Sequence, residues 1–309
     1  MIEKSQKMKS KHQGDVKPKY IISTCFFVLM GILMFVQLVI LLLPIAWAIM
    51  ASFKDPFDFS TSPFSFPDIF CWDNYTRAFK GLEVEYWSDS TQQLVSYNFF
   101  NMFCNSAIYA LISPAWSLLV TFCTSYLLAR YHFFGSKFLY NFAILMMVLP
   151  FSASLSASLY LRKMMGIYDN ILAHIFWGAS GFGFNFVLLY GNIKGLSNTY
   201  GEAAQIDGAG HYTIMFKIYF PMVLPLLFGL FLLAFISSWN DYNTFLVYLP
   251  STPNLAYGTY AFNQWAGVKR YTTPEIMAAF MIIAIPSIIL WIVCHKWSMT
   301  TMKVGGLKG

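Results

Sequence analysis

The residues best placed for a specific chemical role lie in a polar segment, residues 195–220, between two apolar stretches. Thr199 is followed three residues later by Glu202, which is the spacing of a helix capping box. This spacing predicts a short helix, and Gly208 is expected to end it because glycine accepts the left-handed turn that follows a helix. The chemistry that the Glu202 carboxylate offers here is ion pairing with a basic group of a partner.

The predicted helix also has a small face. Ala203 and Ala204, at successive positions, allow another protein to pack closely against it. A second short helix is predicted over residues 212–218, and Pro221 begins the next apolar stretch. Because the segment is too short and too polar to fold alone, we interpret it as a contact surface for another protein. The alternative is an ordinary amphipathic surface helix.

Signals for catalysis or for cofactor binding are missing from the sequence. No G-x-x-x-x-G-K-[ST] pattern occurs, so we expect no ATP bound through a Walker loop. The five histidines are scattered, and His174 is interpreted as a packed or interfacial residue. The five cysteines form no C-x-x-C pair, which predicts neither a disulfide framework nor a metal site. No catalytic residue and no cofactor of its own are therefore predicted.

Two groups of polar residues within the apolar stretches could line a path for a polar solute. The first is a row of serines, whose small hydroxyls also permit close helix packing. The second combines aromatic rings with an amide, which suits a sugar, although an aromatic belt at a membrane interface explains the rings equally well. The candidates are Ser152, Ser154 and Ser156, and Trp239, Asn240 and Tyr242.

The elements that must position these residues are membrane helices. Hydrophobic residues make up 57% of the 309 residues and charged residues only 11%, whereas a soluble domain carries about 25% charged residues. Helices of about 20 apolar residues cross a hydrocarbon core of about 30 Å. The sequence predicts an all-α integral membrane protein with six such helices. Their predicted ranges are 20–50, 99–129, 138–161, 170–192, 221–246 and 276–298.

The distribution of basic residues predicts the orientation. With both termini in the cytoplasm, the inner segments hold 13 of the 20 Lys and Arg residues, as the positive-inside rule requires. Residues 1–19 then form a basic cytoplasmic N-terminus, residues 20–298 the membrane domain, and residues 299–309 a cytoplasmic tail. The outer loop, residues 51–96, carries seven acidic residues and is either a connector or a docking surface for an external partner.

The polar inner segment resembles the EAA motif of ABC importer permeases, EAA-x3-G-x9-I-x-LP. Here Glu202-Ala203-Ala204 is followed by Gly208 and then by Ile218-x-Phe220-Pro221, with Phe220 in place of the usual leucine. With Asp207 beside Gly208, the segment resembles the carbohydrate branch, and in particular the MalG-like subunit of maltose-type importers. Shorter similarities extend from residue 46 to the C-terminus: Ser52-Phe53-Lys54, Asn105-Ser106, Ala129-Arg130-Tyr131, residues 166–170, Trp239-Asn240-Asp241 and the tail.

The resemblance implies a function and a set of partners. In such importers the EAA segment is a coupling helix that docks into a groove on a cytoplasmic ATPase, and ATP and Mg are used by that ATPase. Expected partners are a second homologous permease, two ATPase subunits, an extracytoplasmic solute-binding protein and a sugar substrate, with no nucleic acid. The expected location is the bacterial cell membrane, with several membrane crossings. The residues expected to couple are Glu202, Ala203, Ala204, Asp207, Gly208, Ile218 and Pro221.

Three alternative functions remain open at this point. The first is an ABC permease for a solute other than a sugar. The second is an ion-coupled secondary carrier, which generally needs acidic residues or broken helices within the membrane. Asp241, near the outer end of the fifth predicted helix, is the one candidate for such a residue. The third is a membrane scaffold that transports nothing.

Overall fold

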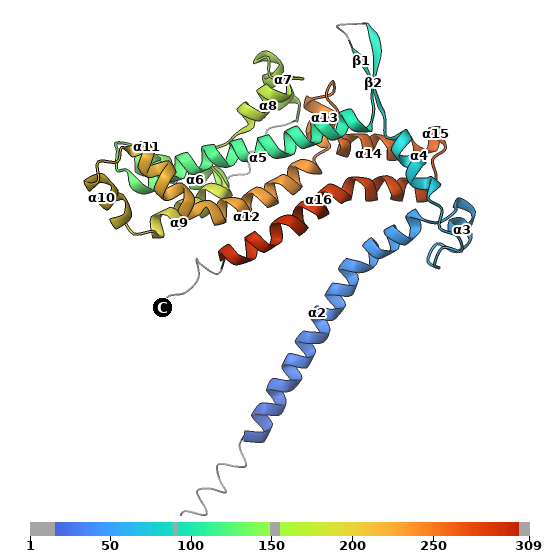
Figure 1. Cartoon of the computed structure of the whole chain (residues 1–309), viewed down its shortest axis with the longest axis horizontal. Helices are drawn as coiled ribbons and strands as arrows, with labels where there is room; N and C mark the ends of the chain where they lie inside the picture. The colour runs from blue at the N-terminus through green and yellow to red at the C-terminus, as the bar shows by residue number, and fades with distance from the viewer. Residues whose placement is uncertain (1–15, 89–91, 149–154, 303–309) are drawn as a thin grey trace, which may run out of the picture.

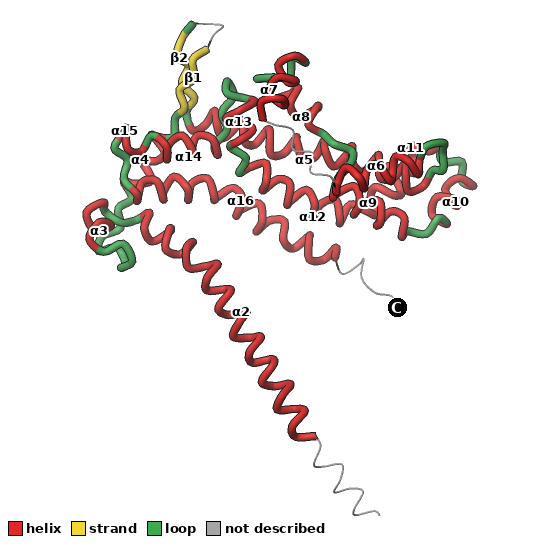
Figure 2. Tube along the Cα trace, turned by 180° about the vertical axis from the view of Figure 1, so that it is seen from behind, coloured by secondary structure: helices red, strands yellow, loops and turns green. Residues whose placement is uncertain are grey.

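The computed structural model describes residues 16–88, 92–148 and 155–302, and this part of the chain is dominated by helices, as the composition predicts (Figure 1, Figure 2). Most of the predicted N-terminal segment and residues 303–309 of the predicted tail lie outside the described residues. Two of the path candidates, Ser152 and Ser154, lie outside them as well.

Within the described residues, four helices are long and apolar enough to cross a membrane. They correspond to the predicted ranges 20–50, 99–129, 221–246 and 276–298. The fifth predicted helix is shorter than expected, because it ends at Trp239 and a separate short helix, α13 (Asn243–Tyr248), follows it. The four long helices are α2 (Val16–Ser52), α5 (Phe99–Arg130), α12 (Phe220–Trp239, with the turns before it) and α16 (Thr273–Met302).

Of the other two predicted ranges, one is interrupted by residues that the structure does not describe, and the other contains a break between two helices. Range 138–161 corresponds to α6 (Ser136–Val148) and α7 (Leu155–Met164), with undescribed residues between them. Range 170–192 corresponds to α8 (Ile171–Gly178) and α9 (Phe184–Gly195), with residues 179–183 outside any helix.

The break between α8 and α9 has a local and a distant cause. Gly183 has a φ of +124°, a conformation that glycine adopts without strain. The carbonyls freed by the break accept hydrogen bonds from α5: Thr121 Oγ1 donates to Ser180 O at 3.1 Å and Thr124 Oγ1 to Gly181 O at 2.7 Å. Neighbouring hydroxyls satisfy irregular backbone inside membrane proteins in this way.

Helix α5 is the centre of the molecule, with α8, α9, α12 and α14 (Leu255–Gln264) packed against it (Figure 1). One buried cluster lies where α5 meets α14 and α16 and includes Met102 and Phe262. A second lies near the other end of α5 and includes Phe122 and Tyr219. The polar inner segment is attached at this second end.

Helix α2 contrasts with this packed body. Residues 26–46 are all exposed, although nearly all are apolar. Figures 1 and 2 show α2 diverging from the other helices and joining them only near its C-terminal end, where it meets α16. A long apolar surface of this kind is stable only against lipid or another protein.

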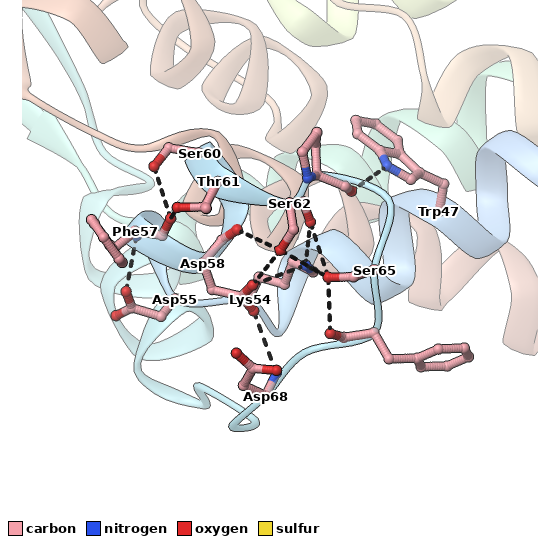
Figure 3. A network of polar contacts seen from close by, with 12 residues as sticks. Trp47, Lys54, Asp55, Phe57, Asp58, Ser60, Thr61, Ser62, Ser65 and Asp68 are labelled. Atoms are coloured by element: carbon pink, nitrogen blue, oxygen red, sulfur yellow. Dashed lines mark hydrogen bonds and ion pairs between the residues drawn. The ribbon is translucent and has the colours of Figure 1, made fainter.

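The chain after α2 is fastened by a buried lysine (Figure 3). Lys54 is fully buried, and its Nζ donates to Ser62 O at 2.6 Å, Ser65 Oγ at 2.8 Å and Asp58 Oδ1 at 3.2 Å. The Ser62 hydroxyl, and then the Lys54 ammonium, lower the pKa of Asp58. The network holds the loop around α3 (Pro56–Thr61), which leads on to α4 (Asp73–Gly81).

A β-hairpin departs from the all-α expectation. Strands β1 (Val84–Ser88) and β2 (Gln93–Tyr97) pair antiparallel, with Val84 opposite Tyr97, and project from the helical body (Figure 1). β-branched and aromatic side chains favour strands. The segment is short and polar at its ends, however, so the alternation of residues typical of a strand was not recognised in the sequence. A last short helix, α15 (Ala266–Lys269), precedes α16.

Candidate functional site

The predicted short helix in the inner segment is present as α10, Thr199–Ile206. Ala204 is 8% exposed and packs in the buried cluster at the end of α5. Glu202 and Ala203 are exposed, and Ile206 is 86% exposed. The two alanines therefore differ in burial: Ala204 attaches the helix to the body, and Ala203 belongs to a free face that carries one carboxylate and one large apolar side chain.

The predicted capping box is wrong. The N-cap of α10 is Asn198, whose side chain makes no capping hydrogen bond to the helix, and Thr199 is the first helical residue. The Thr199 hydroxyl pairs with Ser197 Oγ, which also accepts a hydrogen bond from Thr199 N at 3.2 Å. Because the Glu202 side chain takes part in no capping interaction, it is exposed at the surface and available to a partner.

The prediction that Gly208 ends the short helix is confirmed by the backbone. Its φ is +82°, and its N–H donates to Gln205 O at 3.0 Å, while Ala209 N–H donates to Ala204 O at 2.9 Å. These two bonds form a Schellman motif, in which glycine follows the C-cap, here Asp207. Gly208 thus fixes where α10 ends.

The chain leaves the turn through α11 (His211–Thr213) and a π-helix, η1 (Ile214–Tyr219), which runs directly into α12. The second predicted helix is therefore continuous with the long helix after it. Pro221 has no N–H to donate to the carbonyl of Lys217, and wider π turns accommodate such a defect. Ile218 is partly buried and packs against the cluster at the end of α5.

Helix α10 and its C-cap carry two acidic side chains that form no ion pair among the described residues. Glu202 and Asp207 are exposed, and neither takes part in the ion pairs that the described residues form. They lie near opposite ends of α10. A partner that packs on the free face of α10 therefore meets negative charge beside apolar surface.

Two residues that contact this segment were noticed in the sequence only through family similarity. Arg130 and Tyr131, at the end of α5, contact both the chain entering α10 and the chain leaving it. An Arg-Tyr pair at the end of an apolar stretch is a usual membrane-boundary signal, so the sequence pattern gave no reason to single it out.

The sequence pattern of one known family matches residues 121–300, more than half of the 309 residues, and the match includes α10 and the end of α5. That family is described as the binding-protein-dependent transport system inner membrane component. The chain belongs to this family. It is therefore a membrane-embedded permease, a transport component and not an enzyme.

Several relatives are named as sugar permeases. The permease is 24% identical over 270 residues to the diacetylchitobiose uptake system permease protein NgcG of Streptomyces coelicolor, covering 84% of this chain and 81% of the relative. It is 28% identical over 215 residues to the maltodextrin transport system permease protein MdxG of Bacillus subtilis, covering 68% of this chain and 76% of the relative.

Solved structures share the fold. A bacterial ABC transporter involved in the import of the acidic polysaccharide alginate contains a chain with a TM-score of 0.70 and 21% identity. The alignment covers 88% of the permease and 96% of that chain. The bacterial alginate transporter in complex with alginate pentasaccharide-bound periplasmic protein aligns with a TM-score of 0.55 and 17% identity, over 92% of the permease and 96% of that chain.

The path candidates that the structure describes differ in their burial and contacts. Trp239 is 2% exposed, and its Nε1 donates to Ile283 O at 3.1 Å, so its indole anchors α12 to α16. Asn240 is exposed, and its side-chain amide donates to Ile236 O at 2.8 Å. Tyr242 stacks on Tyr260 with ring centroids 4.6 Å apart. Ser156 is exposed on α7.

His174 and Asp241 both serve the packing of the permease. His174 is 7% exposed, and its Nδ1 lies 2.7 Å from Arg162 Nη1, which agrees with the interpretation of a packed residue. The Asp241 carboxylate accepts a hydrogen bond from Thr244 N at 3.0 Å, at the start of α13. The acid singled out for an ion-coupled carrier is thus engaged at a helix start.

Proposed function

We propose that this chain is the permease subunit of an ATP-driven importer that translocates a sugar or oligosaccharide delivered by an extracytoplasmic binding protein. The observation that carries the proposal is the free face of α10, which lies in the matched part of a family that works with binding proteins. Sugar as the substrate class is supported by relatives that carry diacetylchitobiose and maltodextrin.

The proposed topology has six crossings with both termini in the cytoplasm. The four long helices account for four crossings, and the pairs α6–α7 and α8–α9 account for one each. The distribution of Lys and Arg supports this orientation, since 13 of 20 then lie inside. It places α10 in the cytoplasm, and α3, the hairpin and α13 on the outer side, in a protein that crosses the cell membrane several times.

In this proposal α10 is the coupling helix. Glu202, Ala203 and Asp207 form the docking surface for a cytoplasmic ATPase that binds ATP and Mg. The remaining coupling residues, Ala204, Gly208, Ile218 and Pro221, hold that surface in place through burial, a left-handed turn and the π-helix. Support comes from the exposure of the first group and the packing or backbone geometry of the second.

The proposed assembly contains a second homologous permease, two ATPase subunits and a binding protein. The apolar surface of α2, exposed over residues 26–46, supports a second membrane subunit, because one helix packed along only its end has apolar area to spare. A related fold in complex with a periplasmic protein supports the binding protein. We further propose that the substrate path runs past Ser156, Asn240 and Tyr242 at the interface between the two permeases.

The test is ATP-driven uptake in proteoliposomes that contain the full chain with the second permease, the ATPase subunits and the binding protein that we propose as its partners. The probes are radiolabelled maltotriose, diacetylchitobiose and a galactooligosaccharide, with glycine betaine as a solute that is not a sugar. We expect uptake of at least one sugar. This uptake should require ATP on the side of the membrane where the ATPase lies, and it should continue in the presence of a protonophore.

Each other outcome has a definite meaning. Uptake that a protonophore abolishes while ATP remains present points to an ion-coupled carrier and overturns the proposal. Uptake of glycine betaine alone keeps the importer but overturns the sugar class. Absence of ATP-driven uptake of every probe, in vesicles whose assembled complex is confirmed by size, rejects the proposed substrate class.

A further inference from the structure

Arg130, the last residue of α5, fastens the chain that enters α10. Its Nη2 donates to Ile193 O at 2.5 Å and to Leu196 O at 2.8 Å, and its Nη1 donates to Oδ1 of Asn198. Ile193 O also accepts the N–H of the C-cap residue Leu196 at 3.2 Å, and a cation is favoured at a helix C-terminus. Arg130 thus caps α9 from another helix and holds the residue that precedes α10.

The same guanidinium also contacts the chain that leaves the turn. Its Cζ lies over the ring of Tyr219, 4.5 Å from the ring centroid. Tyr219 is 2% exposed and is the last residue of η1, so it is fixed in the core where α12 begins. Its hydroxyl reaches back toward Ser197 O at 3.5 Å. One side chain therefore connects both arms of the inner segment to α5.

Tyr131, the next residue, makes a second attachment. Its hydroxyl lies 2.8 Å from Nδ1 of His211, the first residue of α11, and the two rings meet edge to face with centroids 5.5 Å apart. Its ring also packs against Tyr126 of α5. The start of α11 is therefore tied to the same end of α5 that holds the residues before α10.

We propose that Arg130 and Tyr131 form a clamp that fixes α10 to the end of α5, and that displacement of α10 by its partner reaches the membrane helices through this clamp. The inference rests on the proposed coupling role of α10 and adds the route by which the coupling leaves it. Both are positioning residues, since neither touches substrate or the ATPase contact face. Helix α5 suits the role because it is the central helix of the packed body.

The chemistry of the clamp requires arginine at the first position. A guanidinium offers several donors in one plane and a flat face for stacking, so it can bind three acceptors and a tyrosine ring at once. A lysine ammonium keeps the charge but not the planar fork. Arg130→Lys is therefore expected to weaken the clamp, and Arg130→Met to remove it.

Lys194 provides a matched control. It lies in the last turn of α9, beside the same loop, but it is exposed and its Nζ donates to Tyr190 OH, one turn back in its own helix, at 3.3 Å. Lys194→Met removes the same charge from the same neighbourhood without cutting any contact between α5 and α10. Tyr131→Phe removes one hydroxyl and leaves the ring in place.

The first measurement is amide hydrogen exchange of residues 197–209 in the full chain, purified in nanodiscs with the subunits that accompany it. Arg130→Met should speed exchange in this segment about tenfold or more, because local opening becomes easier when few contacts remain. Arg130→Lys and Tyr131→Phe should have smaller effects. Lys194→Met should leave exchange unchanged. Equal acceleration in Arg130→Met and Lys194→Met, or none in either, overturns the clamp.

The second measurement is the number of ATP molecules hydrolysed per sugar molecule taken up. Without the clamp, α10 still docks but moves independently of α5, so uptake should fall about tenfold while ATP hydrolysis persists. A merely structural role would lower both together, with the ratio unchanged, and that result overturns the transmission role. If the wild-type complex shows no ATP-driven uptake, the proposed function fails, while the exchange measurement still decides the clamp.

Discussion

Lys54 and Arg130 stand at equivalent places in the molecule and do related work. Each follows or ends a long apolar helix, and each captures a loop through backbone carbonyls: Lys54 at the end of α2 and Arg130 at the end of α5. Lys54 binds groups 4 to 11 residues further along the chain, one of them the Asp58 carboxylate. Arg130 binds neutral groups 63 to 68 residues away.

The difference separates a local anchor from a long-range connection. Lys54 closes a short loop and is fully buried, so its network shapes the chain next to it and little else. Arg130 is only partly buried and joins three segments, the ends of α5, α9 and η1. Loss of the first should therefore appear as lost stability, and loss of the second as lost coordination between parts that remain folded.

The largest effect is expected from Lys54→Met. Only Lys54 itself is fully buried, and replacing it removes three hydrogen bonds that tie the loop to the end of α2, while Asp58 and Ser62 O keep one hydroxyl donor each. We expect the thermal unfolding midpoint of the purified chain in detergent to fall further than in Arg130→Met. Lys80→Met, which removes an exposed charge on α4, serves as control. A smaller fall than in Arg130→Met contradicts the distinction between anchor and connection.

Glu202→Gln tests the loop that Arg130 holds. Glutamine and glutamate have similar helix propensities, and the Glu202 side chain caps nothing, so α10 should persist. The hydrogen bond of a charged group to a partner is worth about 1.5–3 kcal/mol. We expect less ATPase to co-purify with the variant at low salt, with uptake reduced in parallel. Full recovery of ATPase at every salt concentration, together with full uptake, excludes Glu202 as a contact.

Gly208→Ala tests whether the turn after α10 matters apart from the clamp. A left-handed backbone costs a residue with a Cβ about 1–2 kcal/mol, and Gly208 has a φ of +82° with open space around it. We expect faster amide exchange in α10 and a modest drop in uptake. Gly210→Ala is the matched control, because Gly210 has a φ of −72°. Equal effects of the two substitutions show that the turn conformation is not the cause.

The smallest expected effect is a dependence of stability on pH, which applies to the Lys54 network because it contains a carboxylate, and not to Arg130, which binds neutral groups. The pKa of Asp58 is lowered in the folded protein from its ordinary value of 3.8, chiefly by the Ser62 hydroxyl. Its ionised form therefore adds stability above that ordinary value, and the contribution is lost as the pH falls through the lowered pKa. The unfolding midpoint should drop more steeply below pH 4 in the wild type than in Asp58→Asn. Identical profiles show that the ionised Asp58 carboxylate does not stabilise the fold.

Much of the site was predictable because it depends on near neighbours in the chain. Glu202, Ala203 and Gly208 appear where their spacing places them, on a short helix that a glycine ends. The prediction of a capping box was wrong because Ser197 Oγ pairs with the Thr199 hydroxyl and accepts from its N–H. The sequence spacing alone does not decide between these two local hydrogen-bond patterns. The division of Ala203 and Ala204 between surface and core needed the neighbouring helix, which spacing alone does not reveal.

The sequence by itself determined the membrane character, the four long apolar helices and the turn at Gly208, because hydrophobic length and glycine φ are properties of a few consecutive residues. The tertiary structure decided the rest. The predicted helix 170–192 is interrupted where hydroxyls of α5 donate hydrogen bonds to its backbone carbonyls. Trp239 lies in the core, and Arg130 contacts a loop more than 60 residues away in the chain. These outcomes depend on partners distant in the chain, which only packing brings together.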